Sequence, residues 1–186
     1  TDIAPARVRP EDFFAVIEIE KGSKNKYEMD KETGALRLDR ILYTSTHYPA
    51  NYGFIPRTWA DDGDPLDVLV LCSECIRPLS LVECYPIGVI SMEDSGSLDE
   101  KIIAIPFQDP TYNTYQDISE LPNHVASEIR HFFRVYKSLS GQVKSNTQHK
   151  SRHPKSGACF YRYGASRGRA RKCLLRKGDL CLLYTS

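Results

Sequence analysis

The sequence predicts an α+β fold that is built mainly from β-strands. Short apolar runs recur along the first two thirds of the chain, and turns rich in Gly, Pro, Asp and Asn separate them. One clear helical period follows, over residues 121–137. The chain has 186 residues, which is enough for a single domain with a sizeable core.

The first strands are expected near the N-terminus. Residues 13–20 alternate in polarity, with Glu18 on the face opposite to Ala15, Ile17 and Ile19. Short strands follow at 26–29 and 35–40, each after a polar turn. The three runs together predict a β-meander.

Further strands are expected along the chain, at 68–71, over 81–92 as one or two strands, and at 101–106. The last two enclose an acidic segment, which we expect to be a loop. Its acidic residues are Glu93, Asp94, Asp99 and Glu100.

The helix expected over residues 121–137 begins with Pro122, a residue that suits a first helical turn. Its apolar residues recur at helical spacing and form one face. They are Val125, Ile129, Phe132, Phe133 and Tyr136. The pair Tyr136-Lys137 is expected to end the helix.

The stretch Asp61-Asp62-Gly63-Asp64-Pro65-Leu66-Asp67 is the densest group of charges in the chain. Four carboxylates within seven residues repel one another unless a cation lies among them. Mg²⁺ is a suitable cation because it prefers oxygen ligands. Asp, Gly and Pro are also common in surface turns, so an acidic turn without a metal explains these residues as well. An EF-hand does not fit, because the later glycine and the terminal glutamate are missing.

The charge is distributed unevenly. Residues 138–186 contain eleven Lys and Arg against one acidic residue, whereas residues 1–137 contain fourteen against twenty-three. This C-terminal part is rich in Ser and Gly and has little helical or strand period, so we expect a disordered tail.

The six cysteines show no second pair at zinc spacing, and reduced thiols are the simpler interpretation. The chain has no run of about eighteen apolar residues and no N-terminal secretory pattern. These observations predict a cytoplasmic protein that does not interact with a membrane.

With these residues in view, the chain resembles the soluble inorganic pyrophosphatases of family I, over about residues 16–137. The most specific piece is Asp62-Gly63-Asp64-Pro65-Leu66-Asp67, which is similar to the family signature D-G-D-P-x-D. Supporting pieces occur in family order with similar spacing: Lys26-Tyr27-Glu28, Asp39-Arg40, Tyr48-Pro49-Ala50-Asn51-Tyr52-Gly53 and Tyr136-Lys137.

The resemblance implies a closed β-barrel of the OB type, flanked by helices. It implies hydrolysis of pyrophosphate to two phosphates, with several Mg²⁺ ions per site. It also implies a homo-oligomer, specifically a hexamer, and no nucleic-acid partner.

The resemblance assigns roles residue by residue. Asp64 matches the carboxylate that assists the attacking water. The metal ligands are Asp62, Asp67, Asp94 and Asp99. The groups that hold the phosphates are Lys26, Arg40, Tyr52, Lys101, Tyr136 and Lys137. The supporting residues are Glu18, Glu28 and Tyr48.

The resemblance ends at the C-terminus. We expect a pyrophosphatase domain over residues 1–143 that lacks the family's final helix, and a basic tail without family likeness over residues 144–186. Residues 181–186 equal the translation of a sequencing-library adapter, so our hypothesis is a frameshift near residue 144 with adapter read-through.

Two alternatives to an active enzyme are open. The first is a module that keeps the fold and binds metal or phosphate but has lost turnover through its altered end. The second is a nucleic-acid binder that uses the basic run at residues 167–172, but the acidic body argues against it.

Overall fold

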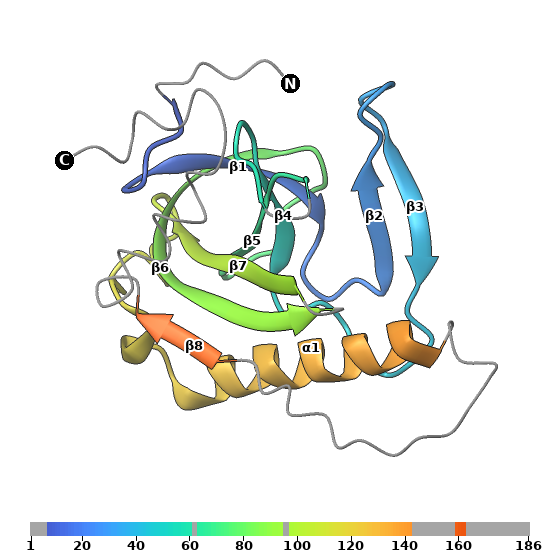
Figure 1. The fold of residues 1–186 in the computed structure, drawn as a ribbon. Coiled ribbons are helices and arrows are strands. Elements are labelled where there is room, and N and C mark those ends of the chain that lie inside the picture. Colours follow the sequence, from blue (N-terminus) through green and yellow to red (C-terminus); the bar gives the residue numbers. More distant parts are fainter. Residues whose placement is uncertain (1–6, 61–62, 95–96, 143–158, 163–186) are drawn as a thin grey trace.

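The computed structural model describes residues 7–60, 63–94, 97–142 and 159–162. Within these ranges the chain is mainly β, with one long helix that lies across one end of the strands (Figure 1). The fold class predicted from the sequence is therefore confirmed at this level.

The main sheet closes on itself. Its strands are β1 (Phe13–Ile19), β4 (Asn51–Ile55), β5 (Leu66–Val70), β7 (Ser97–Pro106) and β6 (Leu81–Asp94). They pair in that order, and β6 pairs again with β1, which completes a circuit. All of these pairings are antiparallel except that of β5 with β7, which is parallel.

Apolar side chains explain why these strands form. The alternating residues Ala15, Ile17 and Ile19 of β1 are buried, as the sequence predicted. Gly53 of β4 allows close contact with β1, because a Cβ at this position would lie 1.9 Å from the carbonyl oxygen of Val16. A side chain at residue 53 would push the two strands apart.

The strands β2 (Asn25–Met29) and β3 (Leu36–Ile41) form a separate antiparallel hairpin beside the main sheet. The prediction of a meander through β1 is therefore wrong. The reason is that β1 pairs with β4 on one edge and with β6 on the other, so neither edge remains for β2.

Helix α1 (Asn123–Gln142) begins directly after Pro122 and buries the predicted apolar side, with Ile129, Phe132 and Phe133 each at most 3% exposed. It does not end at the Tyr136-Lys137 pair but continues to Gln142. A short 3-10 turn, η2 (Ile118–Glu120), precedes it, and Asp117 caps this turn by accepting the N–H of Ser119.

The acidic segment before residue 101 is mostly strand rather than loop. Strands β6 and β7 pair as far as Asp94 and Ser97, so Glu93 and Asp99 lie in the ladder. Extended pairing of the two strands leaves residues 95–96, which lie outside the described ranges, as the connection between them.

The expected disordered tail differs from the structure at one place. Strand β8 (Cys159–Arg162) pairs antiparallel with β6, from Gly88 to Ser91. The rest of residues 144–186 lies outside the described part of the chain.

In the described part of the chain, no helix is long and apolar enough to cross a membrane. Cys72, Cys75 and Cys84 are free thiols, as the sequence predicted.

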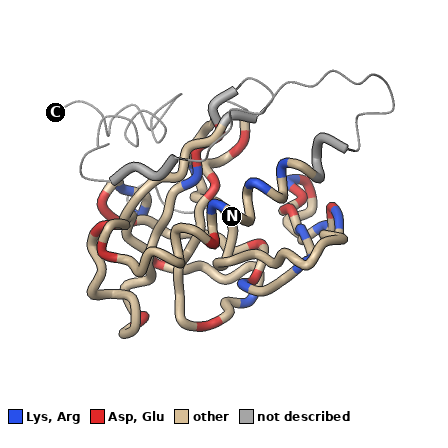
Figure 2. Tube along the Cα trace, turned by 90° about the horizontal axis from the view of Figure 1, so that it is seen from below, with Lys and Arg blue, Asp and Glu red and all other residues tan. Residues whose placement is uncertain are grey.

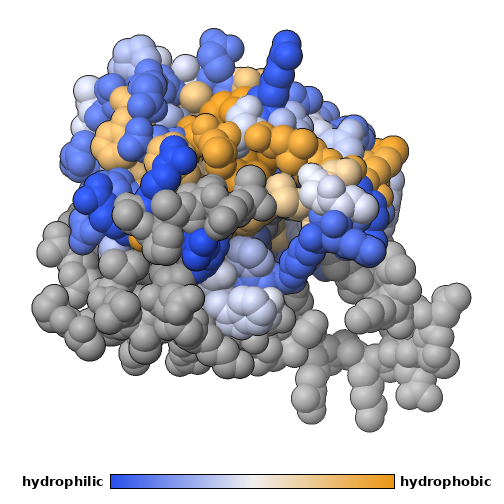
Figure 3. Space-filling model, turned by 90° about the horizontal axis from the view of Figure 1, so that it is seen from above, coloured by the Kyte–Doolittle hydropathy of each residue, from blue (hydrophilic) through white to orange (hydrophobic). Residues whose placement is uncertain are grey.

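Charged and apolar side chains occupy different parts of the surface. Figure 2 shows Lys and Arg interleaved with Asp and Glu on the side of the molecule where the β2–β3 hairpin stands. Figure 3 shows apolar side chains in a band across the face that is seen from above. The hairpin side therefore carries charges of both signs close together.

Candidate active site

The described part of the acidic stretch, residues 63–67, leads directly into β5. Gly63 has a φ of 89°, in the left-handed region that a residue without Cβ adopts easily. Its N–H donates to the carbonyl oxygen of Ala60 at 3.1 Å, and the N–H of Ala60 donates to the carbonyl oxygen of Asp64 at 2.7 Å. These bonds fix the backbone at Asp64. The predicted metal ligand Asp62 lies outside the described residues.

Two of the predicted metal ligands meet at one ammonium group. Lys101 Nζ lies 2.5 Å from Asp67 Oδ2 and 3.0 Å from Asp99 Oδ1, and the hydroxyl of Tyr52 donates to Asp67 Oδ2 at 2.5 Å. The parallel register of β5 and β7 places Asp67 opposite Lys101. Residues that are far apart in the sequence thus form a compact charged cluster on the main sheet.

The cluster perturbs the protonation of its members. Burial alone would lower the pKa of Lys101, but the charges and hydrogen bonds of Asp67 and Asp99 outweigh it, so its pKa is raised. The rings of Tyr52 and Phe133 lie 5.7 Å from the same ammonium and add cation–π attraction. Burial, and then Asp67, raise the pKa of Tyr52 well above its usual value. Lys101 therefore stays charged and Tyr52 stays neutral.

The donor atoms around this cluster are oxygens, which suit a hard divalent cation. The residues that the structure describes include no group of three or more His, Cys, Asp or Glu side chains that could hold a metal ion. The predicted ligand set is only partly described, because Asp62 and the side chain of Asp94 fall outside the described atoms. Asp67 and Asp99 are the two predicted ligands whose side chains are described, and they share Lys101.

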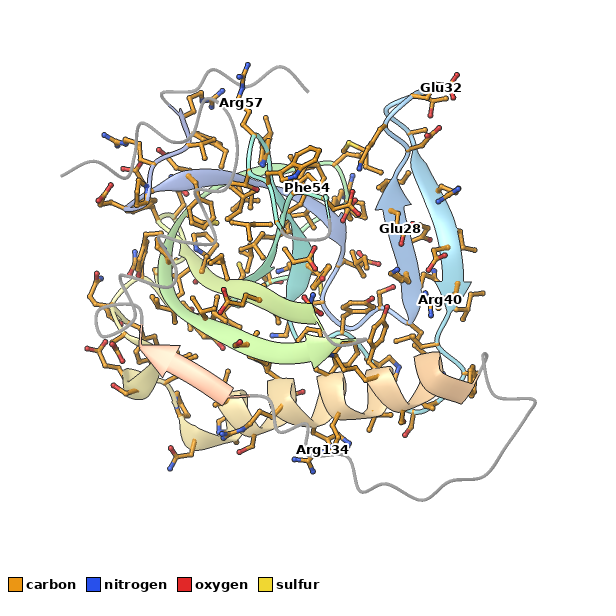
Figure 4. All side chains as sticks on the ribbon, in the orientation of Figure 1. Glu28, Glu32, Arg40, Phe54, Arg57 and Arg134 are labelled. Carbon is orange, nitrogen blue, oxygen red and sulfur yellow. The ribbon has the colours of Figure 1, made fainter. Side chains whose placement is uncertain are left out.

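A second charged cluster lies on the β2–β3 hairpin, where Figure 4 labels Glu28 and Arg40. Lys26 Nζ lies 2.5 Å from Glu28 Oε1 and 3.1 Å from Asp39 Oδ2. Arg40 Nε donates to Asp39 Oδ2 at 2.8 Å, and Arg37 Nη2 to Glu28 Oε2 at 3.3 Å. Burial opposes the charge on Lys26, but its hydrogen bonds to Glu28 and Asp39 prevail and raise its pKa.

Glu18 connects the main sheet to the hairpin. Its Oε1 accepts the N–H of Met29 at 2.7 Å. Burial raises the pKa of Glu18 to about 7, the charges of Asp67 and Glu28 add to the rise, and the Met29 bond and Lys26 oppose it. Groups from both clusters therefore act on this one carboxyl.

Aromatic side chains fill the space between the clusters. The Tyr48 ring lies 5.5 Å from that of Tyr52 and 4.8 Å from that of Phe132, and the Phe132 ring stacks on Tyr136 at 5.8 Å. Burial raises the pKa of Tyr48, and Tyr136 and Asp67 contribute. The pKa of Arg40 is raised, mainly by its hydrogen bond to Asp39, and Tyr136 contributes to the rise. Lys137, the next residue on α1, is half-buried.

Asp64 contacts the tip of the β2–β3 hairpin. Its carboxylate is 61% exposed and forms an ion pair with Lys31 of that tip. Asp64 lies three residues before Asp67 along the chain.

Several residues that contact the predicted site residues had no site role in the prediction from sequence. Asp39 bridges Lys26 and Arg40, Lys31 pairs with Asp64, and Phe133 covers Lys101. Asp39 had a local signal, because it precedes Arg40 in a charged strand. Lys31 and Phe133 had none, since their partners are distant in sequence.

Comparisons with known proteins identify the family of this chain. The sequence model of the family described as Inorganic pyrophosphatase matches residues 15–159, and so extends past the predicted domain boundary at residue 143. The chain is 49% identical over 140 residues to the inorganic pyrophosphatase of Aquifex pyrophilus, which covers 74% of this chain and 79% of the relative.

Solved structures are similar as well. The inorganic pyrophosphatase of Thermus thermophilus is 37% identical, with a TM-score of 0.76 over 95% of this chain and 94% of its own. That of Helicobacter pylori is also 37% identical, with a TM-score of 0.78 over 94% of this chain and 97% of its own. The chain belongs to the inorganic pyrophosphatase family.

Proposed function

We infer that this chain hydrolyses inorganic pyrophosphate to two phosphates. One observation supports this beyond family membership: Asp67 of the main sheet and Lys26 of the hairpin both act on the carboxyl of Glu18, which links the two parts. Pyrophosphate is a small and highly charged anion. A site for it needs cations that hold the phosphates and carboxylates that hold a metal and assist a water.

We propose Mg²⁺ as the cofactor, held by Asp62, Asp67, Asp94 and Asp99. The carboxylate oxygens of Asp67 and Asp99 suit a hard cation. In this structure the ammonium of Lys101 lies between them and offsets their negative charges. When bound, the metal would lower the pKa of a coordinated water and offset the charge of the substrate.

The protein side chains then have separate tasks. Asp64 accepts or orients the proton of the attacking water. Lys26, Arg40, Lys101 and Lys137, with the hydroxyls of Tyr52 and Tyr136, bind phosphate oxygens and offset the charge that develops on the leaving group. Glu28 and Asp39 hold Lys26 in place. Glu18 fixes the hairpin through the N–H of Met29, and Tyr48 packs against the ring of Tyr52.

The remaining expectations from the resemblance are also proposals. The closed circuit of five paired strands supports an OB-type barrel. A hexameric assembly, a cytoplasmic location and a domain limited to residues 1–143 rest on the resemblance and on the sequence.

The deciding experiment measures phosphate release from pyrophosphate by the purified chain, with Mg²⁺ and with a chelator. We expect release that depends on Mg²⁺ and that falls about 100-fold or more in Asp64→Asn, which is about 2.7 kcal/mol in activation free energy. Arg134→Gln, on the outer side of α1 (Figure 4), is the control and should behave as the parent.

Three outcomes would count against the proposal in different ways. A folded chain that binds Mg²⁺ and pyrophosphate without releasing phosphate would be the impaired binding module. A folded chain that binds neither would contradict the function as a whole. Asp64→Asn with turnover within about twofold of the parent, near 0.4 kcal/mol, would remove Asp64 from the role of base.

A further inference from the structure

The tip of the β2–β3 hairpin is a hydrogen-bonded turn. The N–H of Asp30 donates to the carbonyl oxygen of Ala35, and the N–H of Gly34 donates to that of Asp30, both at 2.8 Å. The Asp30 carboxylate accepts the hydroxyl of Thr33 at 2.6 Å. Gly34 has a φ of 71°, which a residue without Cβ tolerates. The backbone at Lys31, inside this turn, is therefore fixed.

The turn that carries Asp64 is fixed as well. Upstream, the bonds among Ala60, Gly63 and Asp64 close it. Downstream, the N–H of Leu66 donates to the buried hydroxyl of Thr58 at 2.7 Å, and β5 begins at once. Asp64 thus has limited freedom in its backbone, and the position of its carboxylate depends on its side-chain torsions and on its partner.

That partner is Lys31, which is thirty-three residues away along the chain. Their ion pair is exposed, with 73% of the lysine and 61% of the aspartate side chain accessible to solvent. Such a pair contributes little to folding stability. It does join the hairpin that carries Lys26 and Arg40 to the loop that carries Asp64. The described contacts include a second link between the hairpin and the main sheet: the N–H of Met29, just before the same turn, donates to the carboxylate of Glu18.

We propose that Lys31 is a positioning residue that orients the Asp64 carboxylate and fixes the distance between this base and the phosphate-binding hairpin. This proposal rests on the proposed function. It adds that the contact between Lys31 and Asp64 keeps the base at a fixed distance from Lys26 and Arg40, the hairpin cations that bind phosphate. Lys31 itself does not touch the substrate.

Steady-state kinetics of three variants test it. Lys31→Gln should lower kcat about fivefold, or about 1 kcal/mol, with KM for pyrophosphate within about twofold of the parent. Lys31→Arg keeps the charge and the reach, and should restore most of the loss. Arg134→Gln removes the same unit of charge far from the hairpin and should leave both constants unchanged. A rise in KM alone, or no effect in Lys31→Gln, would overturn the proposal.

A double-mutant cycle tests whether Lys31 acts through Asp64. In the Asp64→Asn background, Lys31→Gln should have almost no further effect on the residual kcat, because the carboxylate that it orients is gone. An equal fivefold loss in both backgrounds would overturn the proposal, since Lys31 would then act by another route.

A readout without activity separates this proposal from the proposed function. Trp59 is the single tryptophan of the chain, and its Cζ2 atom lies 3.8 Å from where a Cβ would stand on Gly63, so its emission reports on the Asp64 turn. The backbone of this turn keeps its own hydrogen bonds in Lys31→Gln, but the turn loses the side chain that contacts Asp64 and becomes more open to solvent. We therefore expect Lys31→Gln, but not Arg134→Gln, to change the emission and the acrylamide quenching of Trp59. If the parent releases no phosphate, the proposed function fails. The emission measurement still tests the contact between Lys31 and Asp64, because unchanged emission in Lys31→Gln would overturn it.

Discussion

The two charged clusters of this protein contain similar residues but differ in their surroundings. On the main sheet, the Lys101 side chain is 7% exposed and pairs with Asp67 and Asp99. On the hairpin, the Arg37 side chain is 70% exposed and pairs with Glu28. A buried charge that loses its partner is left without solvent, whereas an exposed one is rehydrated. The same type of ion pair should therefore affect stability strongly in one region and weakly in the other.

Lys101→Met should have the largest effect. With a chelator present, we expect it to lower the free energy of unfolding by about 3 kcal/mol, because Asp67 and Asp99 lose their shared cation. Mg²⁺ should recover part of this loss if it binds the same carboxylates. Urea unfolding with and without Mg²⁺ measures both effects, with Lys101→Arg as the variant that keeps the charge. A loss that is the same with Mg²⁺ and with chelator would contradict a metal site at Asp67 and Asp99.

Glu18, between the two clusters, should give a pH dependence. Its pKa in the folded protein is about 7, above the ordinary value of 4.5, so the native state binds more protons than the unfolded state between these values. The free energy of unfolding should therefore fall as pH rises from about 4.5 to about 7, by about 1–2 kcal/mol for this partly exposed carboxyl.

Urea unfolding in chelator across this pH range checks the Glu18 prediction. Glu18→Gln should flatten the fall, because the amide does not ionise. Glu20→Gln removes a carboxylate from an exposed neighbour and should keep the slope of the parent. Equal slopes in the parent and in Glu18→Gln would refute the assignment.

Lys26→Gln should have a smaller effect on folding and a clear one on substrate. Its side chain is 19% exposed and contacts Glu28 and Asp39, so we expect a loss of about 1 kcal/mol in unfolding free energy and a KM for pyrophosphate about tenfold higher. Arg37→Gln, on the same hairpin, should change the unfolding free energy by less than about 0.5 kcal/mol. If Arg37→Gln destabilised the protein as much as Lys26→Gln, solvent exposure would not explain how much an ion pair contributes to stability.

Prediction from sequence succeeded where the signal was local. The strand at residues 13–20 and the helix after Pro122 were found from periodicity, because burial of one face imposes that period on the sequence. It failed for the partners of the strands. β1 does not pair with β2, since both of its edges are used by β4 and β6, which come much later in the chain.

The candidate site shows the same division. The motif that contains Asp64 and Asp67, together with Lys26 and Arg40, was assigned to the site through the resemblance to a known family. Their contacts were not predicted. Tyr52 was predicted to bind a phosphate of the substrate, and in this structure its hydroxyl donates a hydrogen bond to Asp67. Lys31 carried no signal, because a lysine in a polar turn looks like any solvated cation.

The sequence by itself determined the position of most strands, the helix, the acidic turn and the family, because these depend on neighbouring residues and on a distinctive set of motifs. The tertiary structure decided which charges meet. The parallel register of β5 with β7 places Lys101 between Asp67 and Asp99, and the placement of the hairpin brings Lys31 to Asp64. These contacts join segments that are distant in the chain, so the period within any one segment does not show which charges meet.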